Sequence, residues 1–137
     1  MLLHTGNIIA DKSYDYANRM VKAYKFLKFK QKEYIMSKQL LRSGTAVRAL
    51  VGEAEFAQST NDFISKNSIA LKEANESVYW LHLLHDNEYI DDSSFDSIIK
   101  DAKEIVAILV SIIKKSKEQK QSSSKERKLM KKEKSLN

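Results

Sequence analysis

The sequence contains no cysteine and no proline, and only three glycines, Gly6, Gly44 and Gly52. The absence of cysteine excludes disulfide bonds, thiolate metal sites and thiol catalysis. Because there is no proline and so little glycine, no helix is broken by a ring and few turns need a positive φ angle. These absences favour an all-α protein with short connections, in a reducing compartment such as the cytoplasm.

Long apolar runs are also missing. No run approaches the roughly 20 residues that a membrane-spanning helix needs. The N-terminal residues lack the basic region and the small-residue cleavage site of a signal peptide. We therefore expect a cytoplasmic protein with no membrane partner. The chain has 137 residues, which is enough for one domain with a modest core.

Charge is distributed unevenly along the chain. Residues 1–52 carry 10 basic and 3 acidic groups, residues 53–113 carry 4 and 12, and residues 114–137 carry 10 and 3. Two interpretations are open for the first two segments. Their opposite charges attract each other across the folded protein, or the basic segment forms a surface for nucleic acid.

Helical periodicity predicts four helices, at about 12–30, 34–58, 61–86, and from the turn at 86–94 to Ile113. Asp11 or Ser13 is the expected N-cap of the first helix. Four such helices with short links fold most simply as an up-down-up-down antiparallel bundle. The expected organisation is an N-terminal extension at 1–11, the bundle at 12–118 and a Lys-rich tail at 119–137. The tail is too polar to offset its ordering entropy, so we expect it to be disordered or a frayed helix.

The apolar faces follow from the same spacing. In the first helix the expected stripe is Tyr14, Ala17, Val21, Tyr24 and Leu27, and Met20 and Phe26 widen it. The fourth helix has two adjacent seams, which is more than one flank of an isolated bundle needs. The first contains Phe95, Ile98, Ala102, Ile105, Leu109 and Ile112, and the second Ile99, Val106 and Ile113. This width predicts burial on two sides, for example in a subunit interface.

The segment 40–63, "LLRSGTAVRALVGEAEFAQSTNDF", combines glycines and charges inside a helical pattern. Its small residues allow a neighbouring backbone to come close, so Gly44 and Gly52 are interpreted as packing contacts. If the turn to the next helix centres near residues 59 and 60, Arg42 lies level with Glu76, and Glu73 is one turn away. We therefore predict a structural ion pair between Arg42 and Glu76 or Glu73.

Catalytic and metal constellations are not supported by the sequence. A di-iron site in a helical bundle needs Glu-x-x-His pairs, and none occurs. His82 and His85 are spaced by three residues, but histidines at a helix end are more commonly structural than ligating. We therefore expect a protein that is not an enzyme, with no catalytic residue, no metal, no cofactor and no small-molecule substrate.

The motifs "QLLRSGT", "EA", "DFI", "IALKEA" and "YWL" stand together between residues 39 and 81. In this combination the chain, from about Tyr14 to Ile113, resembles the four-helix bundle proteins encoded in intervening sequences of bacterial large-subunit (23S) ribosomal RNA genes. That family includes the accessory variability determinant of diversity-generating retroelements. The resemblance implies a homopentamer of antiparallel bundles, without catalytic activity, that binds nucleic acid through basic surfaces. Ala46, Arg48 and Leu50 depart from the Ser, Gly and Asn that are usual in the family.

Two functional hypotheses remain. In the first, a homo-oligomer binds RNA or DNA non-specifically through phosphate contacts. The candidate contacts are Lys22, Lys25, Lys28, Lys30, Lys32, Lys38, the lysine tail and, if it faces outward, Arg48. No stacking platform with interleaved aromatic residues is evident, so sequence-specific recognition is not expected. In the second, the protein is a scaffold or an accessory subunit, for example of a reverse transcriptase, with no direct role in nucleic-acid binding.

Overall fold

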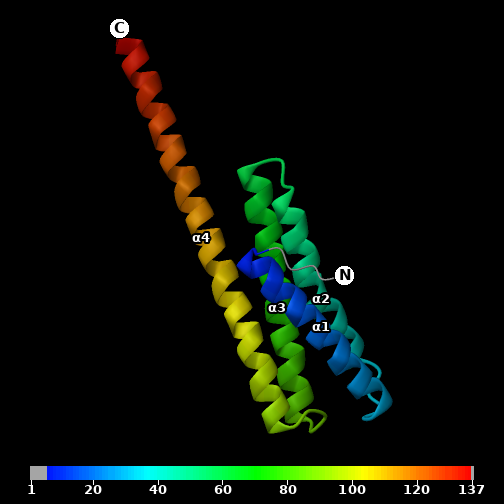
Figure 1. Cartoon of the computed structure of the whole chain (residues 1–137). Coiled ribbons are helices and arrows are strands. Elements are labelled where there is room, and N and C mark those ends of the chain that lie inside the picture. Colours follow the sequence, from blue (N-terminus) through cyan, green and yellow to red (C-terminus); the bar gives the residue numbers. More distant parts are fainter. Residues whose placement is uncertain (1–5, 137) are drawn as a thin grey trace.

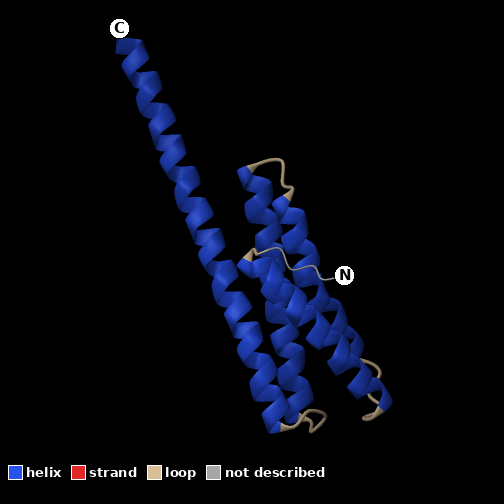
Figure 2. Ribbon diagram, in the orientation of Figure 1, coloured by secondary structure: helices blue, strands red, loops and turns tan. Residues whose placement is uncertain are grey.

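The computed structural model describes residues 6–136, which form an antiparallel four-helix bundle with up-down-up-down topology (Figure 1). The helices are α1 (Ile8–Phe29), α2 (Met36–Glu55), α3 (Thr60–Asp86) and α4 (Asp92–Leu136). Within these residues no strand is present, and short links join the helices (Figure 2). The predicted fold class is therefore confirmed. The links α1–α2 and α3–α4 lie at one end of the bundle, and the link α2–α3 lies at the other.

Helix α1 begins at Ile8, before the expected start at Lys12. Its N-cap is Asn7, whose side-chain oxygen accepts a hydrogen bond from the backbone nitrogen of Ala10 at 3.2 Å. The predicted caps Asp11 and Ser13 are wrong, because both lie within the helix. Ile9 and Ala10 are buried in the core. The bundle therefore includes residues that the sequence assigned to an N-terminal extension.

The buried face of α1 is rotated relative to the predicted stripe. The core side is formed by Ile9, Ser13, Tyr16, Met20 and Leu27. The sequence pattern correctly placed Leu27, and Met20 at the edge of the stripe, on the buried side, but it missed Ile9, Ser13 and Tyr16. Both hydroxyls are satisfied internally: Ser13 donates to the carbonyl of Ile9 at 2.6 Å. A hydrogen bond of 2.8 Å joins the hydroxyls of Tyr16 and Ser77.

Helix α2 is held at its start by a carboxylate. Glu33 is buried and accepts hydrogen bonds from the backbone nitrogens of Ile35, Met36 and Ser37, at 3.0, 2.9 and 2.7 Å. These satisfy donors that the first turn of a helix leaves free. Burial alone would raise the pKa of Glu33, but the backbone hydrogen bonds lower it below its usual value. The α1–α2 link is therefore an ordered structure anchored from within.

Both seams of α4 are covered within a single chain. Ile99 and Ile113 of the second seam are buried, and Val106 is partly buried. Helix α4 packs against α3 and, less extensively, against α1, and together these neighbours cover the wide apolar face. The width of this face is explained by the bundle itself. It is no longer an argument for a subunit interface.

The C-terminal segment differs from its expected disorder. Helix α4 continues without interruption to Leu136 and passes well beyond the α2–α3 link (Figure 1). Every residue from 117 to 136 is exposed, which agrees with the polar composition of the segment. The segment has no glycine or proline and is rich in Lys, with several Glu and Gln, all of which are good helix formers. We call residues 117–136 the α4 extension.

Candidate nucleic-acid interface

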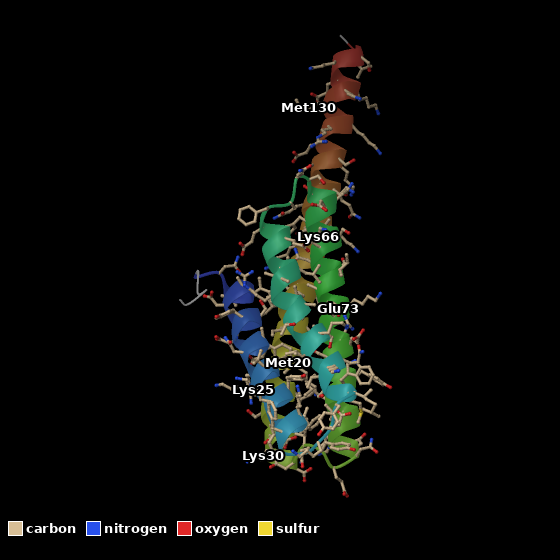
Figure 3. All side chains as sticks on the ribbon, turned by 90° about the vertical axis from the view of Figure 1, so that its right-hand side faces the viewer. Met20, Lys25, Lys30, Lys66, Glu73 and Met130 are labelled. Atoms are coloured by element: carbon tan, nitrogen blue, oxygen red, sulfur yellow. The ribbon has the colours of Figure 1, made fainter. Side chains whose placement is uncertain are left out.

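Six candidate lysines gather around the end of α1 and the start of α2. We call this group the lysine cluster; it consists of Lys22, Lys25, Lys28, Lys30, Lys32 and Lys38. All are exposed except Lys28, which is partly buried. Figure 3 shows Lys25 and Lys30 at the end of the bundle opposite the α4 extension, where Met130 is labelled. Lys32 adopts a left-handed backbone conformation with a φ angle of 57°, which turns the chain between the two helices.

The ion pairs that join the helices do not use the lysine cluster. Lys12 binds Glu104 at 2.9 Å, and Arg19 binds Asp101 at 2.7 Å, both between α1 and α4. These contacts support electrostatic attraction across the bundle. No lysine of the cluster forms an ion pair with a carboxylate of residues 6–136. The lysine cluster therefore retains positive charge for a partner outside the bundle.

Exposed aromatic rings accompany the lysine cluster. Phe29 is 60% exposed and Tyr34 is 50% exposed. The ammonium group of Lys28 lies 5.7 Å from the ring centre of Tyr24 and 5.4 Å from that of Phe29. The sequence pattern did not predict this arrangement of lysines and exposed rings. A signal was available, because Phe29 follows the buried Leu27 by two residues, which turns it by about 200° away from the core.

The α4 extension is a second basic region, separate from the first. It carries lysines and one arginine on an exposed helix that projects beyond the α2–α3 link (Figure 1). Its 20 residues correspond to about 30 Å of helix. The Nζ atom of Lys120 contacts the side-chain oxygen of Asn61 near the base of the extension. The two basic regions lie at opposite ends of the molecule and do not form one continuous surface.

Arg42 on α2 reaches two carboxylates on α3. Its guanidinium lies 3.1 Å from Glu73 Oε2 and also pairs with Glu76. Trp80 Nε1 donates a hydrogen bond of 3.2 Å to Oε2 of Glu76, the oxygen that also pairs with Arg42. Burial alone would lower the pKa of Arg42, but the charges of Glu73 and Glu76 raise it. The Arg42 side chain is 51% exposed, so this is a surface network and not a buried pair.

We expect Arg42→Ala to lower the free energy of unfolding by about 1 kcal/mol at low salt, since exposed pairs contribute up to that amount. The loss should shrink at high salt because solvent ions screen these charges. Urea unfolding at two salt concentrations measures both effects. Arg42→Lys keeps the charge but loses the second contact. Its free energy of unfolding should therefore lie between those of the wild-type chain and Arg42→Ala. A loss that is independent of salt would show that packing, and not charge, is the source.

Arg48 does not join the lysine cluster. It is partly buried, and its Nε atom is buried without a hydrogen-bond partner among the described residues. Its guanidinium packs over Gly52, where an added Cβ would lie 2.9 Å from Nη1. The condition that Arg48 faces outward is therefore only partly met. Gly52 accommodates this side chain and is not a contact between helices.

The two histidines of α3 have structural partners. His85 stacks on Phe95 with ring centres 4.2 Å apart, and His82 meets the same ring edge-on at 4.9 Å. His85 Nε2 lies 2.6 Å from Asp92, and this hydrogen bond raises the pKa of His85. Within residues 6–136, no group of three or more His, Asp or Glu side chains could hold a metal ion. In the same range, no helix is both long and apolar enough to cross a bilayer.

Comparisons with known proteins identify relatives of the whole bundle. The model of the family described as "23S rRNA-intervening sequence protein" matches residues 6–111. A crystal structure from Bacteroides thetaiotaomicron, described as a protein of unknown function from the S23 ribosomal protein family, is 56% identical in sequence. The match covers 79% of this chain and 96% of that chain, with a TM-score of 0.78. No curated protein matches this chain.

Proposed function

This chain belongs to the 23S rRNA-intervening sequence protein family, and we propose that it is a non-enzymatic, homo-oligomeric protein that binds RNA or DNA through two basic regions. The observation that carries the proposal is the α4 extension, a helix with every residue exposed and a large excess of positive charge. Such a helix adds nothing to the core, so its role lies outside the bundle. The proposed compartment is the cytoplasm, where such ligands are found.

The chemistry of binding follows from the side chains available. Lysines contact phosphates as point charges and do not distinguish bases, so recognition through them is independent of sequence. Each contact releases a condensed counterion, which makes the affinity fall with rising salt. The lysine cluster and the α4 extension both offer such contacts. Their separation allows one nucleic acid to touch both ends, or two nucleic acids to bind at once.

The test is a salt titration of binding to a structured RNA, followed by fluorescence anisotropy. A plot of log K against log salt should be linear, with a slope of roughly −0.7 to −0.9 for each phosphate contacted. Duplex DNA of similar length serves as the comparison. If neither RNA nor DNA binds at about 50 mM salt, where contacts of this kind are strong, the nucleic-acid proposal fails and the scaffold hypothesis replaces it.

The proposed oligomer is a homopentamer, as the family resemblance implies. Additional support comes from large apolar side chains exposed on α3 and α4: Ile69 is 41% exposed, Tyr79 56% and Val110 48%. Light scattering of the purified protein should give a mass of about five chains, because burial of such side chains favours association. A monodisperse monomer at micromolar concentration would overturn this part of the proposal.

A further inference from the structure

The end of α1 combines positive charge with exposed aromatic rings. Phosphate binding needs only the charge. The lysine cluster supplies positive charge, and Phe29 presents an exposed ring beside it. A single exposed aromatic residue is ordinary on a protein surface. Here, however, Lys28 lies within 6 Å of the ring centres of both Tyr24 and Phe29, at 5.7 and 5.4 Å. Charge and ring are therefore held at one place.

Positive charge with adjacent aromatic rings is the arrangement that binds single-stranded nucleic acid. In a single strand the bases are unpaired, and each has a flat face that can stack on an aromatic side chain while lysines hold the neighbouring phosphates. A regular duplex hides those faces, so an exposed ring contributes nothing to its binding. The rings near the lysine cluster thus favour an unpaired segment over a duplex.

The backbone beneath these rings is ordered. The backbone N–H of Lys30 donates to the carbonyl of Phe26 at 2.9 Å, and the backbone N–H of Glu33 donates to the carbonyl of Leu27 at 2.9 Å. The Gln31 side chain donates to the carbonyl of Tyr89 in the α3–α4 link at 3.0 Å. Because the link is already fixed, a base that stacks on Phe29 does not have to order the protein. A preformed surface of this kind loses less entropy on binding.

The surroundings restrict where a strand can run. The α3–α4 link at the same end of the bundle carries Glu88 and Asp91, with Asp86 and Asp92 at the adjoining helix ends. These carboxylates repel phosphates. A nucleic-acid strand should therefore run along the side of α1 and α2 that faces away from the α3–α4 link. The α4 extension cannot act in the same way, because residues 117–136 contain no Phe, Tyr or Trp.

We infer that the lysine cluster and Phe29 form a binding site for single-stranded RNA or DNA, in which lysines contact phosphates and an unpaired base stacks on Phe29. This inference rests on the proposed function and specifies its ligand. The α4 extension remains a region of phosphate contacts that makes no distinction between single and double strands.

The test compares Phe29→Ala with the wild-type chain, using a labelled 20-nucleotide oligouridine and an RNA duplex of 20 base pairs. Loss of one stacked base should weaken oligouridine binding about tenfold. Duplex binding and the salt slope should be unchanged, because no charge is removed. Phe29→Trp should restore the oligouridine affinity.

The matched control is Phe56→Ala. Phe56 is 84% exposed but lies in the α2–α3 link, at the opposite end of the bundle. Its removal should leave oligouridine binding unchanged. Circular dichroism checks that each variant is folded, and light scattering checks its mass.

The failures can be told apart. If Phe29→Ala binds oligouridine as tightly as the wild-type chain, and wild-type binding falls with salt, the stacking inference is wrong and the proposed function stands. If the wild-type chain binds neither probe, the proposed function fails and the inference fails with it. If Phe29→Ala lowers the mass of the oligomer, Phe29 belongs to an interface between copies, and the inference is overturned.

Discussion

Gly44→Val should lower the free energy of unfolding by about 3 kcal/mol, at the upper end of the usual cost of overpacking a core. A Cβ added at Gly44 would lie 2.2 Å from Cγ and 2.5 Å from Sδ of Met20. Met20 has no exposed surface, so its side chain cannot swing into solvent to make room. Urea denaturation measures the loss. Gly44→Ala should have a smaller effect in the same direction, because alanine has higher helix propensity than glycine.

Gly52→Ala is the matched control, since both glycines lie within α2. A Cβ at Gly52 would meet only Nη1 of Arg48, at 2.9 Å, which is the free end of a flexible side chain. Arg48 can move aside, so the gain in helix propensity should prevail and stabilise the protein by up to about 1 kcal/mol. The double variant Met20→Ala with Gly44→Ala should lose less stability than the sum of the two single losses, because the Met20 side chain that clashes with the added Cβ is absent. If Gly44→Ala and Gly52→Ala change the free energy of unfolding equally, the close packing of Met20 of α1 against Gly44 of α2 is contradicted.

Deletion of residues 119–137 should cause the largest change in nucleic-acid binding. It removes 7 basic and 2 acidic groups. If all seven cations contact phosphates, the slope of log K against log salt should flatten by about 5 to 6, at roughly 0.7 to 0.9 for each contact. The midpoint of thermal unfolding should be unchanged, because the deleted residues that the structure describes, 119–136, are all exposed and lie outside the core. Anisotropy titrations between 50 and 300 mM salt, with a melting curve for each chain, measure both quantities.

The complementary variant replaces Lys22, Lys25 and Lys28 by Glu in the full-length chain. Because the lysine cluster and the α4 extension lie at opposite ends of the bundle, the two changes should weaken binding additively. If the shortened chain binds RNA as tightly as the intact one, the extension is only a solubility element. If the Glu variant binds normally while the shortened chain does not, the extension alone carries the function.

Helix number, order and the main apolar faces could be predicted from sequence, because they depend on local periodicity. The spacing in α2 predicts a buried side of Leu40, Val47, Val51 or Leu50, and Ala54, and the structure buries Leu40, Val47, Val51 and Ala54. The pairing of Arg42 with α3 followed from the length of the connecting turn, since register in an antiparallel pair is set by that turn. The predicted positions of the helix ends were less accurate. Asn7 stands directly before Ile8 and Ile9, which is a recognised start signal, but the polar residues Asp11 and Ser13 offered later caps of the same kind.

Residue types and their order along the chain thus determined that this protein is an all-α bundle of a known family with a basic C-terminal segment. Tertiary structure decided which of two overlapping faces of α1 is buried. The hydroxyl of Ser13 is satisfied within its own helix, but the hydroxyl of Tyr16 enters the core because Ser77 of α3 supplies a hydrogen-bond partner. Tertiary structure also decided that Gly44 meets Met20, and that Phe29 stands exposed beside lysines. Contacts of this kind join residues far apart in sequence or depend on what neighbouring helices leave uncovered, and a local pattern contains neither.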